Sequence, residues 1–372
     1  MTLGGRDTRD ITLLTGVDLT VLRNFQLQDG TNFEVITGQL TGALAGLNGE
    51  INSDPLFAGL SYVSDQPEVN YRMGSSASFD DHTEYSRPDP NRASLDGHMV
   101  GLKQKDFGLR WTYDYLQKEA RSMGRVDADI QQTIDAGRKL IRTMVLNRLL
   151  RRADDTGAAN GLGAGGISPG FATTAASTGV DFTPPEYGGV AFAATHEHYT
   201  AAATSITLAT VVTMMKNLRE HGHDKPYDLL ISQTDEAAVM GFAGFIAASD
   251  PLITQLASTD TRTSVGGDYI GYLPTAFARV RVVNGWPASY MFMYKSYGPN
   301  SINNPLRLRT PKGDNAVIFR AAPDPAQGAP SPAAPLATLI VYTELGVGTN
   351  SRTNGVSNFS VGNATWADGA SS

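Results

Sequence analysis

The chain has 372 residues and a mass of 39.6 kDa, so its length predicts more than one domain, because one hydrophobic core rarely grows beyond about 250–300 residues. It contains no cysteine, which excludes disulfides, thiolate metal sites, iron–sulfur clusters and cysteine nucleophiles. The formal charge of −7 argues against a basic footprint over the whole protein for binding nucleic acid. Charged residues make up 18%, below the usual share of about 25%. Either long loops or a surface occupied by protein–protein contacts would explain this.

The first 60 residues are irregular in pattern. Glycine recurs at positions 16, 30, 38, 42, 46 and 49, which argues against one long helix there and allows a short helix near residues 32–47. We expect an extended arm. The chain has no apolar run of about 18 residues and no apolar signal sequence, so we expect a cytosolically made protein without a transmembrane helix.

Residues 61–112 predict a long β-hairpin. A strand is expected at 67–73, and a return strand at 98–112, where apolar residues partly alternate. The segment between them is polar and contains the turn signals Pro-Asp-Pro-Asn and Asp-Gly. Excursions this long are usually functional.

The clearest element is a long helix. After a short helix at 113–122, Asp127 is expected to cap a helix that runs to about Ala153, with acids at its start and arginines at its end, as suits the helix dipole. Spacings of three and four residues make one apolar stripe. Its members are Val126, Ile130, Ile134, Gly137, Leu140, Ile141, Met144, Val145 and Leu149.

The rest of the chain mixes loops, helices and strands, so we expect an α+β protein. Residues 154–203 are predicted to be loop, 208–220 a helix closed by Gly222, and 227–231 a strand. Helices are expected from Thr234 or Asp235 to 245 and at 250–256. The later strands are expected at 269–271, 278–283, 290–295, 306–309, 317–320 and 336–345, with a Pro/Ala linker at 323–335 and an alternating tail at 356–361.

No motif predicts a catalytic, cofactor or metal site. Gly161–Gly166 matches G-x-G-x-x-G, but it follows a helix instead of a strand, so we interpret it as a loop. The pairs His196/His198 and His221/His223 lack the i, i+4 spacing of a helical zinc pair. The i, i+2 spacing of the first pair would place both side chains on one face of a strand, where they could hold a metal ion, but we interpret the pairs as loop and helix-end residues. The adjacent carboxylates Asp80-Asp81, Asp154-Asp155 and Asp235-Glu236 lack a partner base or metal constellation, which argues against a catalytic carboxylate pair.

The order of the elements carries a resemblance. The run KQKDFGLRWTYDYLQKEARSM, the long helix DADIQQTIDAGRKLIRTMVLNRLLRRAD and the loop NGLGAGGISPGF resemble the spine region of tailed-bacteriophage major capsid proteins. This is the Hong Kong 97-type capsid fold, which encapsulins share. The segment TSITLATVVTMMKNLREHGHDKPYDLLISQTDEAAVM resembles the entry to the axial domain of that family, and ATLIVYTELGVGTNSRTNGVSNFSV resembles its closing strands.

The resemblance implies a domain plan and a function. The plan is an N-terminal arm at 1–60, an extended loop at 61–112, a peripheral domain at 113–203 with a spine helix at about 126–153, an axial domain at 204–304, and return strands with a tail at 305–372. The implied function is a non-enzymatic major capsid protein. It forms pentamers and hexamers of an icosahedral shell around double-stranded DNA, in the virion and after assembly in the bacterial cytoplasm. Expected partners are further copies, a portal, a separate scaffolding or decoration protein, and DNA held by weak contacts, with no membrane.

The candidate interface residues lie in the return strand and at the end of the long helix. They are Phe107, Leu109, Trp111, Arg142, Arg148, Arg151 and Arg152. A solvated helix face is the alternative for the arginines. Lys103 and Lys105 lie in the loop that some family members crosslink, but no partner Asn or Glu can be matched, so we predict no crosslink. The functional alternatives are an encapsulin-like nanocompartment, a soluble α/β enzyme or another virion protein.

Overall fold

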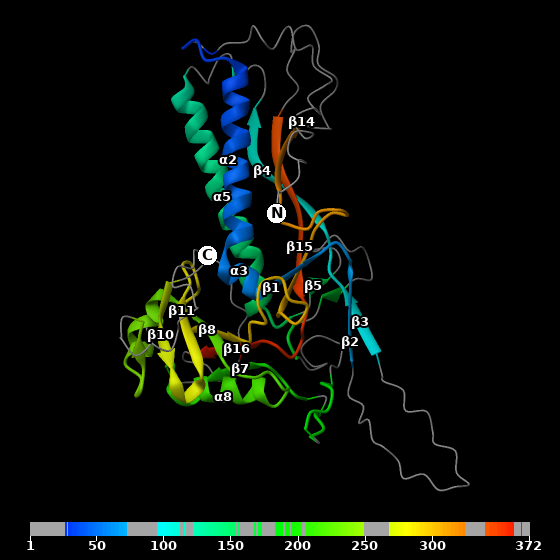
Figure 1. The fold of residues 1–372 in the computed structure, drawn as a ribbon, viewed down its shortest axis with the longest axis vertical. Coiled ribbons are helices and arrows are strands. Elements are labelled where there is room, and N and C mark those ends of the chain that lie inside the picture. Colours follow the sequence, from blue (N-terminus) through cyan, green and yellow to red (C-terminus); the bar gives the residue numbers. More distant parts are fainter. Residues whose placement is uncertain are drawn as a thin grey trace, which may run out of the picture. The chain divides into compact units, whose positions relative to one another are not determined.

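The computed structural model describes most of the chain, and its elements are shown in Figure 1. The described residues are 27, 29–72, 95–111, 115–116, 122–153, 155–156, 167–168, 170–172, 183–188, 190–193, 195–202, 205–248, 268–323, 339–360 and 366. The chain forms two compact units: residues 1–52, 104–142 and 316–345, and residues 53–103, 143–315 and 346–372. Within the described residues, no helix is long and apolar enough to cross a membrane.

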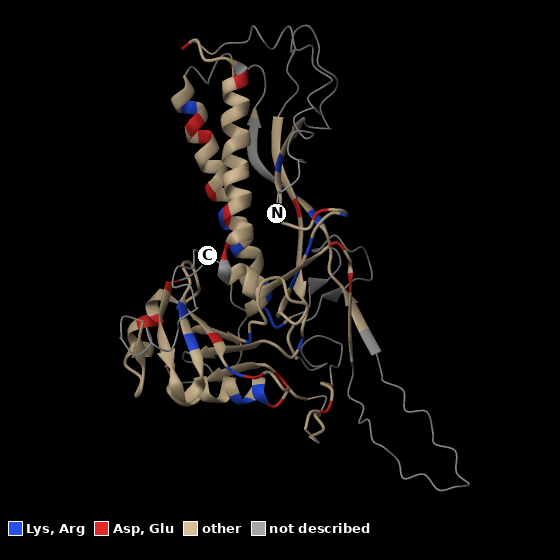
Figure 2. Cartoon of the chain, viewed as in Figure 1, with Lys and Arg blue, Asp and Glu red and all other residues tan. Residues whose placement is uncertain are grey.

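The first unit contains the helix α2 (Phe33–Ser53). It is 21 residues long, so the expectation that its glycines prevent a long helix was wrong. A stripe at helical spacing is buried and offsets the cost of the glycines. The stripe consists of Ile36, Leu40, Leu44, Leu47 and Ile51, each at most 8% exposed. Glu34 and Glu50 are the only charged residues of α2, which is otherwise uncharged in Figure 2.

The helix α5 (Met123–Leu150) is the predicted long helix. It begins four residues before Asp127, so that residue is no cap, and the backbone N–H of Met123 instead donates to Oδ2 of Asp29 at 2.7 Å. This hydrogen bond is the main reason that the pKa of Asp29 is lowered. Arg138 of α5 forms a bidentate ion pair with Glu50 of α2, and the shortest nitrogen–oxygen distance is 2.6 Å. The predicted apolar stripe is buried at Val126, Ile130, Ile134, Gly137, Ile141 and Leu149 and partly exposed at Leu140, Met144 and Val145.

Three strands complete the first unit. They are β4 (Lys103–Trp111), β14 (Phe319–Pro323) and the first part of β15 (Leu339–Thr349), with β15 pairing with both others. The side-chain amides of two asparagines in α2 form hydrogen bonds with the backbone at the start of β14. Asn48 exchanges two hydrogen bonds with Phe319 (2.8 and 3.1 Å), and Asn52 exchanges two with Val317 (2.8 and 3.0 Å).

The second unit is built on a seven-stranded mixed sheet in the order β7-β16-β12-β8-β11-β10-β9. The strands are β7 (Tyr199–Ala202), β8 (Tyr227–Ile231), β9 (Ile246–Ala247), β10 (Asp268–Leu273), β11 (Ala278–Val282), β12 (Tyr290–Tyr294) and β16 (Val356–Ser360). The helix α8 (Leu208–Arg219) packs its buried Val211, Met215 and Leu218 against one face of this sheet. The other face packs against α3 (Pro55–Leu60) and the last turn of α5.

A hairpin and a smaller strand group belong to the same unit. The strands β2 (Glu68–Arg72) and β3 (Leu95–Met99) pair antiparallel. The single return strand predicted at 98–112 was wrong, because the strand pattern breaks at residues 100–102 and the following strand, β4, pairs with β15 instead of β2. The strand β1 (Ser61–Ser64) pairs parallel with β13 (Leu306–Arg309), which pairs antiparallel with the last part of β15. A two-stranded pair, β5 (Asp155–Thr156) with β6 (Ile167–Ser168), lies in the range expected to be loop.

The helix α8 and the strands β8, β10–β13, β15 and β16 confirm the predicted pattern of the later chain, whereas the strand predicted at 317–320 lies at 319–323 as β14. The helix predicted at 234–245 was too long, because α9 (Glu236–Met240) follows a 3-10 turn, η2 (Gln233–Asp235), and ends at Met240. The arm before residue 27, the excursion at 73–94, the helix at 250–256 and most of the Pro/Ala linker lie outside the described residues.

Candidate functional site

The C-terminal end of α5 carries most of the predicted interface arginines. Arg148 is only 1% exposed, and its guanidinium donates to the backbone carbonyls of Arg151 (2.6 Å) and Ala153 (3.3 Å). The carbonyl of Arg151 also accepts a hydrogen bond from the hydroxyl of Tyr199 in β7 at 3.0 Å. Arg148 therefore closes the end of its own helix, where carbonyls lack intrahelical partners and the dipole favours a cation.

The other arginines are more accessible. Nε of Arg152 lies 2.5 Å from Oε1 of Glu197, with about a quarter of each side chain exposed. Arg142 is exposed, and Arg151 is half-buried. A partly exposed ion pair contributes little to stability but fixes the direction of a side chain.

The predicted residues of β4 separate into two groups. Trp111 is 1% exposed, and its indole N–H points to Oδ2 of Asp129 in α5 at 3.4 Å. Tyr115 donates to the same carboxylate oxygen, and burial followed by this hydrogen bond raises its pKa. Trp111 thus anchors the return strand inside the first unit. The side chains of Phe107 and Leu109 are outside the described part of the molecule, so their interface role stays a prediction.

The base of the β2–β3 hairpin is fixed by buried cations. Arg307 donates to the carbonyl of Glu68 (2.6 Å) and to the hydroxyl of Ser64 (2.8 Å), and Arg352 donates to the hydroxyl of Tyr71 (3.1 Å). These arginines line a cavity of about 600 Å³. Because each buried guanidinium is fixed by hydrogen bonds, the base of the hairpin has a defined direction in the subunit.

Several large apolar side chains are exposed on the described surface. In the second unit they are Met99, Tyr187, Val190, Met240, Tyr297 and Ile302, from 39% to 65% exposed, and in the first unit Val35 is 47% exposed. Single exposed apolar residues are normal in soluble proteins. Met99 ends β3, so it places an apolar contact on the hairpin.

The structure brings together histidines that the sequence places in two separate pairs. His196, His198 and His221 converge with Glu220, and one ligand atom from each lies within 4.8 Å of all the others. His223 points elsewhere, to the hydroxyls of Tyr297 (2.8 Å) and Thr353 (3.0 Å).

Burial lowers the pKa of all three imidazoles. It lowers the pKa of His221 to about 3 and that of His198 well below its usual value, and it raises the pKa of Glu220. The sequence signal for the convergence is the i, i+2 pair together with a histidine at a glycine-capped helix end. The adjacency of β7 and the end of α8 could not be read from the sequence.

One comparison with known proteins, the search of solved structures, finds similar folds. No family model and no curated protein matches the sequence. A solved structure from Mycobacterium phage Patience is 17% identical, covers 92% of this chain and 91% of its own, and has a TM-score of 0.59. The bacteriophage PhiM1 mature capsid (12% identity, 81% and 86% coverage, TM-score 0.44) and the capsid of the native GTA particle (11%, 81% and 88%, 0.44) are also similar.

The chain has a phage capsid fold. The likeness to the Patience structure extends over nearly the whole of both chains, and it confirms the resemblance that the sequence predicted. An identity of 17% establishes the fold, so the function is argued separately below.

Proposed function

We propose that this protein is a major capsid protein that self-assembles into pentamers and hexamers of an icosahedral shell around double-stranded DNA. The fold shared with the Patience structure over 92% of the chain is the observation that carries the proposal. The structures that this chain resembles belong to capsids built from many copies, which favours a structural role over an enzymatic one.

Within this proposal, each part of the chain has a role. The arm is 1–60, the extended loop is 61–112, and α5 is the spine helix of a peripheral domain at 113–203 that continues in the return strands and tail at 305–372. The axial domain is 204–304. Its sheet includes two strands from the neighbouring ranges, β7 and β16, since both pair in the seven-stranded sheet.

The β2–β3 hairpin is suited to reach a neighbouring copy. Hydrogen bonds from Arg307 and Arg352 fix the base of the hairpin. The hairpin also carries Met99, whose side chain is 42% exposed. Contacts of one surface with a different surface on the next copy close into rings and shells. Each such contact can be weak, because a shell holds every subunit through several of them at once.

Contact with DNA would be local and weak. The net charge of −7 gives no general attraction to phosphate, and Arg148 is occupied inside the subunit. Because Arg142 is exposed and Arg151 and Arg152 are half-buried, we assign any genome-facing or inter-subunit charge to these three arginines, of which Arg152 also pairs with Glu197. A shell that must release its genome needs no tight binding of phosphate.

The oligomeric state of the purified protein tests the proposal. Sedimentation velocity and electron microscopy are expected to show closed particles or rings of five and six subunits. A stable monomer at high concentration, without rings under any condition, would refute it. Particles from infected cells are expected to contain double-stranded DNA, whereas protein cargo without a genome would favour the encapsulin-like alternative.

A deletion separates folding from assembly. Replacing residues 75–94, which lie between β2 and β3, by a short linker should leave the subunit folded, judged by circular dichroism and thermal unfolding, and should prevent normal shells. Shortening the Pro/Ala linker within 324–337 is the matched control and should leave assembly intact. If the protein lacking 75–94 still forms normal shells, the extended-loop assignment is wrong.

A further inference from the structure

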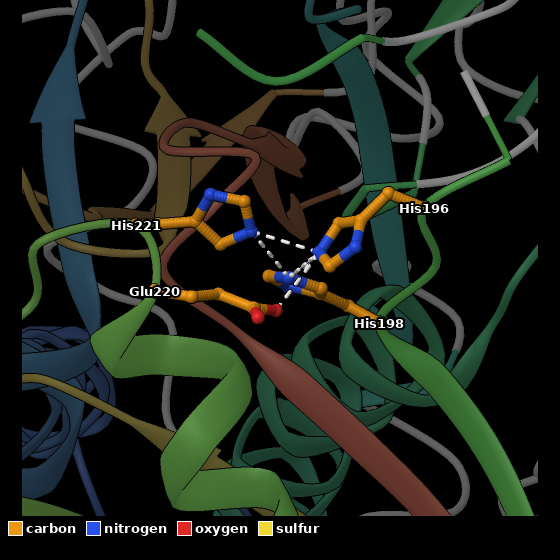
Figure 3. Close-up of side chains that lie close together, drawn as sticks. All are labelled: His196, His198, Glu220 and His221. Carbon is orange, nitrogen blue, oxygen red and sulfur yellow. Dashed lines mark hydrogen bonds and ion pairs between the residues drawn. The ribbon is translucent and has the colours of Figure 1, made fainter. Parts of the chain in front are cut away.

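We propose that His196, His198, His221 and Glu220 form a binding site for a divalent transition-metal ion, with Zn²⁺ as the best fit. The four side chains converge from two elements, as Figure 3 shows. His196 and His198 precede and adjoin β7, and Glu220 and His221 follow the last residue of α8.

Local backbone structure sets this convergence. The i, i+2 spacing of His196 and His198 places both side chains on one side of an extended segment. The carbonyl of His198 accepts a hydrogen bond from Ser357 of β16 at 2.9 Å, which holds that segment against the sheet. At the other side, Gly222 has a φ of +81° and turns the chain immediately after His221.

The distances match a tetrahedral donor set. The Nε2 atoms of the three histidines lie 2.9, 3.0 and 3.1 Å apart, and Oε1 of Glu220 lies 3.3 Å from Nε2 of His196. Zinc binds imidazole nitrogen at about 2.0–2.1 Å, which places two nitrogens of a tetrahedron ~3.3 Å apart. The three nitrogens therefore lie within a few tenths of an ångström of their separations around zinc. The four ligand atoms together lie within 4.8 Å of one another, so a rotation of the partly exposed Glu220 side chain would bring its oxygen to the fourth position.

Protons alone cannot make all three nitrogen contacts favourable. Nδ1 of His198 lies 2.8 Å from the carbonyl oxygen of Gly355, which can only accept, so Nδ1 carries the proton and Nε2 of His198 presents a lone pair. Each of the other two Nε2 atoms offers either one proton or one lone pair. In any assignment, at least two of the three Nε2 atoms carry the same group, so that a proton faces a proton or a lone pair faces a lone pair. A cation at the centre instead accepts all three lone pairs.

The surroundings are those of a metal ligand set. The bond from His198 to Gly355 fixes its tautomer and ring orientation, as outer partners of metal-bound histidines do. The ring of Phe192 covers His196 and His221 at centroid distances of 5.1 and 4.3 Å. Glu220 is 38% exposed, so ions can enter from its side and its carboxylate supplies negative charge.

Four protein ligands leave no open position, so the site is structural. The donor set contains nitrogen and oxygen only, which suits Zn²⁺ and also Co²⁺ or Ni²⁺, and disfavours Mg²⁺ or Ca²⁺. A bound ion would join the end of α8 to the segment before β7. In a chain without cysteine, it would take the place of a disulfide in that role.

Metal titration of the full-length protein tests the site. After chelator treatment and dialysis, Zn²⁺ is titrated in competition with a chromophoric chelator, and Co²⁺ is added to a second sample. We expect one ion per chain, a visible Co²⁺ spectrum of the tetrahedral type, and a higher thermal midpoint with Zn²⁺.

Variants decide whether these four residues bind the ion. The double variant His196→Gln/His221→Gln removes two partly exposed ligands and is expected to weaken Zn²⁺ binding at least about a hundredfold and abolish the tetrahedral spectrum. Glu220→Gln should weaken binding by roughly tenfold. His223→Gln is the matched control, since that imidazole points to Tyr297 and Thr353, and it should still bind one ion.

The outcomes are distinguishable from a folding defect. Circular dichroism establishes whether each variant is folded, and Glu220→Gln changes only a partly exposed side chain. No stoichiometric binding by the wild-type protein, an octahedral Co²⁺ spectrum, or equal affinity in a folded double variant would overturn the proposal. All measurements use the subunit, so they stand whether or not it assembles into shells.

Discussion

Replacing three glycines of α2 by alanine should stabilise the subunit. Gly38, Gly42 and Gly46 lie at i, i+4 and i+8 in the helix interior and are exposed. A Cβ atom added at any of them meets no other atom within 4 Å. The substitution therefore changes the helical propensity and the entropy of the unfolded chain without a steric cost.

The expected gain follows from the helix propensities. Glycine inside a helix costs about 0.8–1.0 kcal/mol relative to alanine. The three positions project to open space and share no packing partner, so their effects should add to about 2.4–3.0 kcal/mol. The free energy of unfolding is measured by urea denaturation of unassembled subunits, with the m-value compared between variants.

A fourth glycine provides the control. Gly222 has a φ of +81°, and a Cβ atom there would collide with the ring of Tyr187, so Gly222→Ala should destabilise the protein. If the triple variant is no more stable than the wild type, or less stable, the description of this helix face as open within the subunit is refuted. If it is more stable but forms no shells, a neighbouring copy packs on the glycine face.

Three further predictions concern single side chains. Asn48→Ala should destabilise the subunit by about 1–3 kcal/mol in urea denaturation, because it leaves buried backbone groups without partners, whereas the exposed Gln39→Ala should change little. Ile130→Ala in α5 removes a side chain that is 3% exposed and should cost about 2–5 kcal/mol, against near-neutral Gln131→Ala, with an equal loss in both variants contradicting the packing assignment. The pKa of His98 is lowered to about 3 by burial and by nearby arginines, so the unfolded chain, whose histidine titrates near 6.5, binds more protons between these values. Stability should therefore fall as pH falls from 6.5 toward 3, by up to about 1.4 kcal/mol per pH unit, and a folded His98→Gln variant with an unchanged pH profile would contradict this.

Periodicity predicted most of the second unit. The helix α8 with its glycine cap, and the strands β8, β11, β12 and β13, lie within a residue or so of their expected bounds, because each has a clear apolar pattern between turn signals. A hairpin after residue 66 was predicted, but its return strand was expected at 98–112, whereas β2 pairs with β3 and the later part of that range is β4. The sheet order was not predicted, because the sequence does not state which strands become neighbours.

The errors have physical causes that lie far away in the sequence. The helix α2 was underestimated because its buried stripe outweighs the cost of its glycines. The start of α5 was misplaced because its first N–H is bonded by Asp29, 94 residues earlier. His196 and His198 were assigned to a loop and His221 to a helix end, because these residues also depend on partners far away in the sequence. They come together only when β7 pairs with β16.

The two asparagines of α2 have a consequence for the free subunit. A strand at the margin of a sheet can pair with any other exposed strand and so start disordered aggregation. At the start of β14, the side-chain amides of Asn48 and Asn52 present a donor and an acceptor each, as a neighbouring peptide would, and so occupy the backbone groups of Val317 and Phe319 at this end of the strand. A protein made at high concentration to join only specific neighbours benefits when such unintended growth is blocked before assembly begins.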